Sequence, residues 1–407
     1  MKKAIFSALT AVLMLSSCAS PIDMINDQET DSVTSEDAQK TRMIHAEIPV
    51  IPEVSAGSPD EDNAPPVIGD DMGYTDDEGI FIYKRDGIYR ELKDMCLNFE
   101  NERVIDGIIE NYEEFLNAWL YLFNYDADIF WTNKFIYEDI GDGKTRLTMT
   151  MRKDIADKDT EELSEMHDEL MKKVDEIVSL ANEKSTDYEK IQFVHDLINE
   201  STTYKYRDYF SYHNTAYGCL IEGESDVDGY AAAFELIMQE LGFTCGICEG
   251  ERTAGSFQWN YIWFGDDYYW IDVGDDDWED ESSRIGTRHY FFMTSSDYFY
   301  IEKFNDDRCM FKPECSSTTY DYFCMNDLLL DKYSRAKIDS IYMACNEDHF
   351  EVKFKNPEDY RRAVAEIYKG KRHDAMEIDK EDFWISIYEP NRSMMLYWDT
   401  DAKHEEQ

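Results

Sequence analysis

The sequence has few basic residues and lacks long apolar runs. Lysine and arginine together number 40, against 88 aspartates and glutamates, and the formal net charge is -48 at pH 7. A surface this negative repels nucleic-acid phosphates and anionic lipid headgroups, which argues against a nucleic-acid-binding protein. It suits a solvated exported protein, or one that meets cations or basic partners. Beyond the N-terminus, no stretch is a credible membrane span.

The N-terminus has the pattern of a secretory signal. Met1-Lys2-Lys3 precedes an apolar stretch at residues 4–15 that is too short to span a bilayer comfortably. Cys18 follows Leu-Ser-Ser, which resembles a bacterial lipobox, where cleavage exposes the cysteine for lipidation. We therefore expect a lipoprotein signal over residues 1–18 and an extracytoplasmic protein anchored to the bacterial cell membrane through Cys18. The alternative is an ordinary signal peptide in which Cys18 is incidental.

Eight further cysteines follow Cys18. Export permits disulfides, but the spacing does not fix their connectivity. Cys245 and Cys248 have the separation of a metal-ligand pair, but no second Cys/His pair stands in zinc register. The sequence therefore predicts no metal site at these cysteines and no cofactor.

Composition and apolar spacing divide the chain into segments. Residues 19–78 are acidic, contain Ser, Thr and Pro, and lack apolar periodicity, so they are expected to form a disordered linker. Residues 79–186 should form an N-terminal α/β region. Its expected elements are helices over 112–125 and 160–181, the second capped by Thr160, and strands at 135–137 and 146–151 around a turn at 141–143.

The rest of the chain divides near residue 330. Residues 187–330 should hold the core, which begins with a helix over 188–199. Residues 331–407 should form a small α+β domain. Its expected elements are strands at 340–344, 350–354, 383–388 and 394–398, and a helix over 358–368 with Pro357 near its first turn.

A series of motifs lies between these outer parts. In order, they are Ala216-Tyr217-Gly218-Cys219-Leu220; residues 225–231, which read Ser-Asp-Val-Asp-Gly-Tyr-Ala; a helix ending at Leu241-Gly242; a strand at 244–249; Phe257-Gln258-Trp259-Asn260; and Ile271-Asp272-Val273-Gly274. This series resembles the transglutaminase-like superfamily, in particular its bacterial secreted members, over about residues 187–300. The resemblance implies an α+β, papain-type core in which a helix packs on an antiparallel sheet.

The resemblance also locates the family's catalytic positions. Such a site has a cysteine at a helix N-terminus, whose thiolate the helix dipole favours, a histidine base on the adjacent strand, and an aspartate that orients the histidine. The matching positions here are Val227, Phe257 and Asp272. Valine has no nucleophilic atom and phenylalanine carries no proton, so the resemblance predicts a pseudoenzyme that retains only Asp272.

A displaced nucleophile is the alternative. Cys219 is the nearest thiol, but it precedes the helix, where no dipole would activate it, and a buried apolar role suits it better. His213 lies nearby in a loop of no predictable geometry. His195 lies on a helix and is expected to be a satisfied structural residue.

Several polar and aromatic residues are candidates for lining a remaining pocket. Asp226 and Asp228 should stand at the helix N-terminus, where capping is the simpler role. Asp272 should either gain a new hydrogen-bond partner or have its pKa raised by desolvation. Tyr230, Trp259 and Asn260 complete the pocket candidates.

Calcium is a weaker alternative. Asp226, Asp228 and Asp272 could supply oxygen ligands to a calcium ion. The run at 275–277 lacks the spacing and central glycine of an EF-hand loop, so we expect a solvated acidic turn there.

Together these patterns predict a lipid-anchored surface protein with a catalytically inactive transglutaminase-like domain. It would act in binding or scaffolding, with a peptide, glycan or protein as ligand. The alternative is a divergent thiol peptidase or transamidase that uses Cys219.

Overall fold

The computed structural model describes residues 87–109, 112–206, 211–252, 255–277, 287–305, 309, 311–345, 349–368 and 383–398, together with four short strands. These strands are β1 (Gln39–Lys40), β2 (Gly73–Thr75), β3 (Phe81–Tyr83) and β15 (Asp379–Lys380). The expected signal with Cys18 lies outside the described residues, as does the expected linker apart from β1 and β2. Each helix in the described part is too short or too polar to cross a bilayer.

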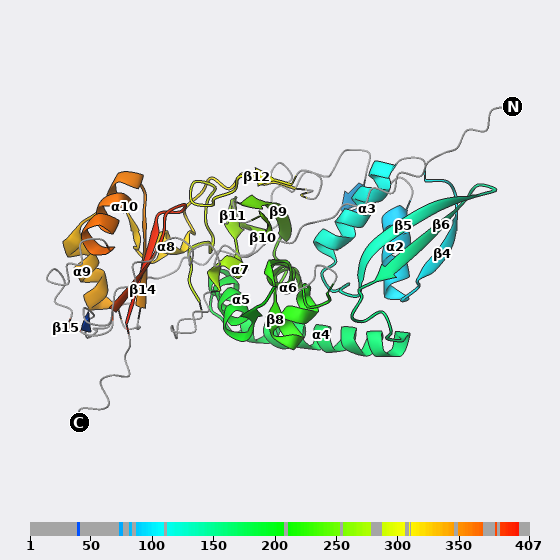
Figure 1. Cartoon of the computed structure of the whole chain (residues 1–407), viewed down its shortest axis with the longest axis horizontal. Coiled ribbons are helices and arrows are strands. Elements are labelled where there is room, and N and C mark those ends of the chain that lie inside the picture. The colour runs from blue at the N-terminus through cyan, green and yellow to red at the C-terminus, as the bar shows by residue number, and fades with distance from the viewer. Residues whose placement is uncertain are drawn as a thin grey trace, which may run out of the picture.

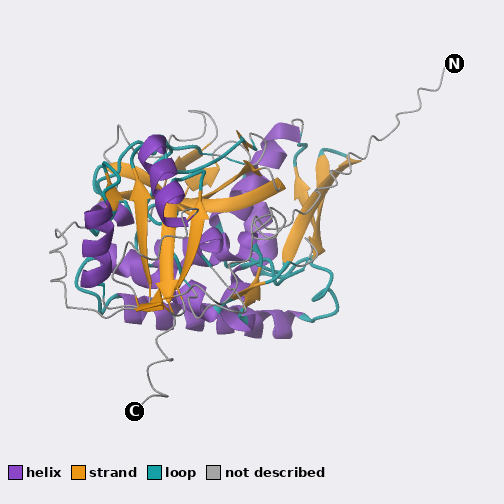
Figure 2. Ribbon diagram, turned by 60° about the vertical axis from the view of Figure 1, so that its left-hand side comes forward, coloured by secondary structure: helices purple, strands orange, loops and turns teal. Residues whose placement is uncertain are grey.

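The described chain is a mixed helix and sheet structure, which confirms the predicted α+β class. Three parts follow one another along its long axis, with the N-terminal region at one end, the core in the middle and the C-terminal part at the other end (Figure 1). In the turned view, helices lie along the lower edge and the strands stand above them (Figure 2).

The N-terminal region is an antiparallel sheet with two helices. The strand order is β4 (Glu102–Asp106), β6 (Lys144–Met151), β5 (Thr132–Gly141), and the helices are α2 (Ile88–Leu97) and α3 (Tyr112–Tyr125). The predicted α3 is confirmed, and both predicted strands are present but longer. Their turn contains Gly141, Asp142 and Gly143, all at positive φ, which suits glycine. The sequence analysis missed α2 and β4.

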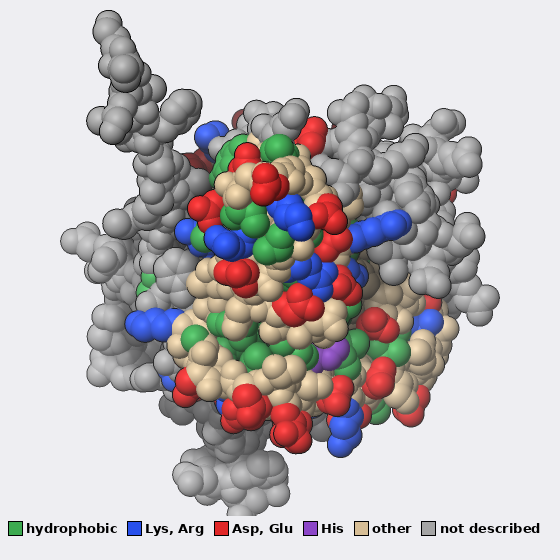
Figure 3. Space-filling model, turned by 90° about the vertical axis from the view of Figure 1, so that its right-hand side faces the viewer, with side chains coloured by type: hydrophobic (Ala, Val, Ile, Leu, Met, Phe, Trp, Pro, Cys, Tyr) green, Lys and Arg blue, Asp and Glu red, His purple; other side chains and the backbone are tan. Residues whose placement is uncertain are grey.

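The outer end of this region carries acidic and basic side chains interspersed with apolar ones (Figure 3). Arg146, for example, lies 2.9 Å from Glu138 across the exposed side of the sheet. Charges of both signs are therefore neighbours on this face, in spite of the acidic composition of the chain.

Two long helices lead into the core. They are α4 (Thr160–Ala181) and α5 (Asp187–Ser201). The predicted span of α4 is confirmed, but its predicted cap is wrong. The cap is Asp159, whose carboxylate accepts hydrogen bonds from the backbone N–H groups of Glu161 and Glu162, while Glu162 accepts one from the N–H of Asp159. This reciprocal capping box satisfies more backbone donors than Thr160 could.

The core is a helix packed on an antiparallel sheet. The sheet order is β11 (Asp267–Ile271), β10 (Gly255–Phe264), β9 (Cys245–Arg252), β12 (Lys303–Phe304), and α6 (Val227–Glu240) packs against β9 and β10. Asp226 caps the N-terminus of α6. Gly242 follows the C-terminus of this helix with φ of +84°, and the sequence had predicted a helix end at this glycine. Smaller elements complete the core: η1 (Gly218–Glu222), β7 (Thr203–Tyr204), β8 (Glu224–Ser225) and α7 (Val273–Asp276).

The C-terminal part has its own sheet and helices. The strand order is β13 (Leu329–Leu330), β14 (His349–Phe354), β17 (Ser393–Trp398), β16 (Phe383–Tyr388). The helices are α8 (Tyr322–Met325), α9 (Arg335–Ala344), α10 (Pro357–Ala363) and η2 (Val364–Tyr368). The strand predicted at 340–344 is wrong, because these residues end α9. Ser334 caps that helix, and it buries Ile338 and Tyr342, four residues apart.

Candidate functional site

The start of α6 holds Val227, which the resemblance aligns with the family's nucleophile. Val227 is the first residue of α6, is half-buried and packs against an aromatic cluster that includes Phe257. The Asp226 side chain accepts a hydrogen bond from the N–H of Asp228 at 3.2 Å, which confirms its capping role. Gly229 follows, and a β-carbon there would lie 1.8 Å from Ser225 Oγ. The backbone at Gly229 is therefore packed too closely for a side chain, and the helix begins with the hydrocarbon side chain of Val227.

The base position is filled by a stack of aromatic rings and a guanidinium. Phe257 lies on β10 opposite Gly250 and stacks on Trp259, with ring centroids 4.7 Å apart. The guanidinium of Arg252 lies over the Phe257 ring, 3.6 Å from the ring centroid. Both side chains are buried, and each is only 5% exposed as a residue. A cation–π contact therefore surrounds Phe257, the residue that the resemblance aligns with the base.

Asp272 has gained Arg252 as its partner. Its Oδ2 accepts a hydrogen bond from Arg252 Nη2 at 3.0 Å, and its Oδ1 accepts one from the N–H of Asp275 at 3.1 Å. Arg252 also bonds the Asp275 carboxylate and donates to the carbonyl of Tyr300 at 2.9 Å. Asp272 is 1% exposed. The carboxylate that would orient a histidine is therefore tied to a buried guanidinium.

Burial governs the protonation of this pair. Desolvation, helped by the nearby Asp276, raises the pKa of Asp272 to about 7, although Arg252 acts in the opposite direction. Burial likewise lowers the pKa of Arg252, against the pull of Asp272. Both outcomes expected for Asp272, a new partner and a raised pKa, are thus present together.

Arg252 is the site residue that the sequence analysis missed. It stands at the end of β9, and the β9–β10 register pairs it with Gly255, two residues before Phe257. Its contact with Asp272 joins the end of β9 to the residue that follows β11, and β10 lies between these two strands in the sheet. The Arg252–Asp272 contact could have been predicted only from the β9–β10 register together with the position of α7.

The pocket candidates separate into surface and interior residues. Asp228 lines a small cleft of about 80 Å³ between α3, α6 and the β9–β10 hairpin. Tyr230, Trp259 and Asn260 are fully buried and lie away from the lining. The Tyr230 hydroxyl contacts the Asp277 carboxylate and the carbonyl of Thr202, and the Asn260 amide donates to the carbonyl of Ala231 at 3.0 Å. These three residues hold the core together.

Cys219 lies in the interior. It belongs to η1, is 1% exposed, and its Sγ lies 3.4 Å from the hydroxyl of Thr202. Burial raises the pKa of its thiol to about 12. The His213 ring pairs with Ser211, with 2.9 Å between Nδ1 and Oγ, and lies 3.8 Å from Asp154. Among the described residues, the Cys219 thiol therefore pairs with Thr202, while the His213 ring pairs with Ser211 and Asp154.

Cys245 and Cys248, the pair with metal-ligand spacing, lie on opposite faces of the sheet. Cys245 packs in the apolar cluster that includes α6, while Cys248 packs in the aromatic cluster with Phe257. Residues three apart on a strand point to opposite faces. Cys245 and Cys248 therefore cannot share an ion.

The acidic run at 275–277 is buried, so the expected solvated turn is wrong. Asp275 bonds Arg252, Asp276 accepts from the N–H of Phe291 and pairs with His195, and Asp277 contacts Tyr230. These partners offset the cost of burying the carboxylates. They come from segments distant in the sequence, so the composition around residues 275–277 does not predict them.

Comparisons with known proteins agree with this fold. Residues 176–274 match the sequence model of the transglutaminase-like superfamily. The span runs from α4 to α7 and contains Val227, Phe257 and Asp272. No curated protein matches the sequence.

Three solved structures are similar to parts of the chain. One is described as a TGase, at 12% identity over 45% of this chain and 53% of its own, with a TM-score of 0.26. A candidate cysteine protease from Cytophaga hutchinsonii matches at 11% identity over 35% of this chain and 61% of its own, with a TM-score of 0.22. A candidate protease from Parabacteroides distasonis matches at 13% identity over 34% and 35% respectively, with a TM-score of 0.20.

The chain therefore spans about half to three fifths of the first two of these structures. The family match, which covers α6, the β9–β10 hairpin, β11 and Asp272, carries the assignment. The chain contains a domain of the transglutaminase-like superfamily in residues 176–274.

Proposed function

We propose that this chain is an exported, lipid-anchored protein of the bacterial cell surface whose transglutaminase-like domain does no thiol chemistry and serves in binding or scaffolding. The observation that carries the proposal is the set of contacts among Arg252, Phe257 and Asp272. A thiol at Val227 and an imidazole at Phe257 would both be needed for an acyl intermediate. Instead, a buried ion pair and a stacked ring fill that volume.

The ligand would bind at the cleft beside α6. Trp119 and Phe123 of α3 form one part of its lining, and Asp228, Glu249 and Gln258 form another. At about 80 Å³ the cleft has room for one side chain. Carboxylates next to aromatic rings favour a basic side chain, so a peptide or protein with an exposed lysine or arginine is the ligand we favour. Arg152 also lines the cleft, where it donates to the carbonyl of Ser211.

Two measurements test the absence of thiol chemistry. The purified chain should neither hydrolyse nor cross-link peptides, and intact-mass spectrometry should find no covalent adduct after incubation with acyl or amide substrates. Activity that iodoacetamide blocks, and that Cys219→Ser removes, would establish the divergent thiol enzyme instead. A positive control from an active family member must turn over the same substrates.

Binding and anchoring need separate tests. A lysine-rich peptide should change tryptophan fluorescence on titration, and Asp228→Asn should weaken its binding, while Asp106→Asn on the far sheet should not. In cells, Cys18→Ala should move the chain out of the membrane fraction.

Calorimetric titration with millimolar calcium should give no heat, since Asp272 is bound to Arg252 and Asp226 caps α6. Binding that depends on calcium would favour the calcium alternative.

A further inference from the structure

A second buried polar cluster lies on the other side of α7, outside the family's catalytic positions. His195 and Asp196 come from α5, and His289 comes from the segment between α7 and β12. Asp196 Oδ1 lies 2.8 Å from His195 Nδ1 and 3.1 Å from His289 Nε2. One ligand atom from each of the three residues lies within 4.8 Å of the others. Two imidazoles and a carboxylate thus converge on one point.

The nitrogen at the far side of each ring faces a second carboxylate. His195 Nε2 lies 3.2 Å from Asp276 Oδ2, and His289 Nδ1 lies 3.8 Å from Glu351 Oε2. Histidines that bind metal ions usually pair the opposite nitrogen with a carboxylate or carbonyl, which fixes the ring and makes it a better ligand. His195 has this arrangement with Asp276, and Glu351 lies within ion-pair distance of the opposite nitrogen of His289. Both outer carboxylates are buried.

The surrounding structure holds both rings in place. Tyr322 stacks on His289 with centroids 4.0 Å apart and planes at 9°, and the His195 ring packs on Phe292 at 4.9 Å. The outer carboxylates are fixed as well. Asp276 accepts hydrogen bonds from the N–H of Phe291, and Glu351 accepts them from the N–H of His289. Little reorganisation would therefore be needed for an ion to bind.

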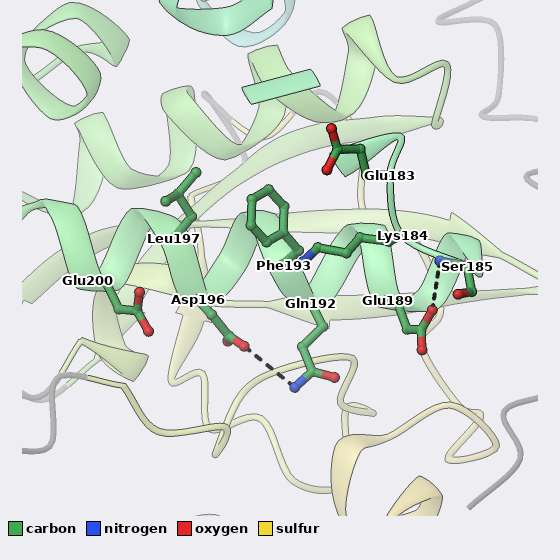
Figure 4. Close-up of a pocket in the computed structure, with 9 residues that line it drawn as sticks. All are labelled: Glu183, Lys184, Ser185, Glu189, Gln192, Phe193, Asp196, Leu197 and Glu200. Carbon is green, nitrogen blue, oxygen red and sulfur yellow. Dashed lines mark hydrogen bonds between the residues drawn. The ribbon is translucent and has the colours of Figure 1, made fainter. Parts of the chain in front are cut away.

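Solvent reaches the cluster through Asp196. Its side chain is 27% exposed and forms part of the lining of an open groove of about 480 Å³ along α5. Figure 4 shows Asp196 and Gln192 extending from the same side of α5, joined by a hydrogen bond. Glu183, Glu189 and Glu200 also line the groove. These carboxylates would attract cations toward Asp196.

We propose that His195 Nδ1, His289 Nε2 and the Asp196 carboxylate bind a divalent transition-metal ion of the zinc class, with water from the groove completing the coordination. Two nitrogen ligands and one oxygen suit zinc, whose protein sites use histidine and carboxylate at tetrahedral geometry. Calcium and magnesium prefer oxygen ligands throughout and are disfavoured. The site is independent of the proposed binding function, and nothing in it depends on Val227, Phe257 or Asp272.

Binding requires protons to leave the imidazoles. Without an ion, the two carboxylates beside His195 take hydrogen bonds from both ring nitrogens, so the ring carries two protons. To bind the ion, Nδ1 gives its proton to solvent and presents its lone pair, while Nε2–H continues to donate to Asp276. Asp196 turns from accepting these hydrogen bonds to binding the ion. Zinc uptake should therefore release protons and become tighter as pH rises.

The ion would link three parts of the fold. His195 belongs to α5, His289 lies between α7 and β12, and Glu351, next to His289, belongs to β14 of the C-terminal sheet. A structural site of this kind adds its binding free energy to the stability of the folded chain.

The test uses the folded wild-type chain from residue 19 onward, stripped with a chelator and then titrated with zinc chloride by calorimetry. We expect one equivalent to bind with a dissociation constant of about 10 µM or tighter. Repeating the titration in buffers of different ionisation enthalpy should show proton release. Cobalt should give the visible absorption bands of a four- or five-coordinate ion, and millimolar calcium or magnesium should not compete.

Matched variants assign the ligands. His289→Gln should weaken zinc binding by about 100-fold or more, and Asp276→Asn, behind His195, by roughly 10- to 100-fold. His167→Gln is the control, because His167 also pairs with an aspartate, Asp128 at 3.1 Å, but has no second histidine beside it. The proposal fails if the wild-type chain binds no zinc at 100 µM free ion, a concentration about tenfold above the expected constant. It also fails if His289→Gln binds zinc as tightly as His167→Gln does.

Discussion

Two polar clusters meet at α7, which is a single helical turn. They differ in the basic side chain that pairs with the aspartates, an arginine in the first cluster and a histidine in the second. Asp272 and Asp275 pair with Arg252, while Asp276, one residue further on, pairs with His195. The Arg252 guanidinium offers only hydrogen-bond donors, so the first cluster presents no nitrogen ligand for a metal ion. An imidazole can lose a ring proton and bind a metal ion, so the second cluster can do so. The two clusters therefore share a helical turn but differ in the ligands that they can offer.

The largest expected effect comes from removing the fixed cation. Arg252→Met keeps much of the apolar stem but leaves Asp272 and Asp275 buried without their partner. Breaking a buried ion pair in this way typically costs about 3 to 5 kcal/mol. Urea denaturation followed by tryptophan fluorescence should show a loss of unfolding free energy in that range.

Arg146→Met serves as the matched control for this variant. Arg146 makes exposed pairs with Glu138 and Glu102, which are worth about 0 to 1 kcal/mol. Equal losses in the two variants would mean that the Arg252 cluster contributes no more than a surface pair, and the contrast between the clusters would disappear.

A second prediction concerns the pH dependence from Asp272. Its folded-state pKa, raised to about 7 by burial, lies above the unfolded value of 3.8, so the folded chain holds the proton more tightly. The associated stability is present below pH 4 and is lost as pH rises through 7. Asp272→Asn should flatten this part of the stability curve, which is on the order of 4 kcal/mol in height. Asp106→Asn, an exposed residue, should leave it unchanged.

A third prediction concerns His195, measured with a chelator present. Burial opposes its charged form, but hydrogen bonds to Asp196 and Asp276 outweigh burial and raise its pKa to about 9, and His289 lies beside it. Its contribution is therefore full below pH 6.5 and is lost as pH rises through 9, a change on the order of 3 kcal/mol. His195→Gln should remove this fall, and His167→Gln should keep it. A wild-type curve that is flat over this range would show that the second cluster does not titrate.

The sequence predicted the elements that carry strong periodicity or clear boundaries. The apolar spacing of α3 and α4 predicted these helices correctly, because each buries one face against the rest of the fold. The apolar runs at β16 and β17 also predicted strands correctly. The error at 340–344 arose because five residues at the end of α9 show too little of the helical period to be distinguished from a strand.

The candidate site was predictable where motifs are local and hidden where contacts are distant. The capping role of Asp226 followed from its position before α6, whereas the alignment of Val227, Phe257 and Asp272 with catalytic positions stays a prediction. Arg252 and the partners of residues 275–277 could not be found, because they depend on strand register and on segments far away in the chain. The proximity of His195 and His289, which are distant in sequence, has the same cause.

The course of α4 affects how this protein should be divided into fragments. The family match begins at residue 176, inside α4, but the apolar cluster that α4 joins is continuous from Ile88 to Met293. α4 runs beneath both the core and the N-terminal region (Figure 1). A fragment cut at residue 176 would lose Leu163, Leu170 and Val174 and would uncover their apolar partners. The N-terminal region and the core should therefore melt as one cooperative unit, and the smallest fragment that remains soluble should begin before α2.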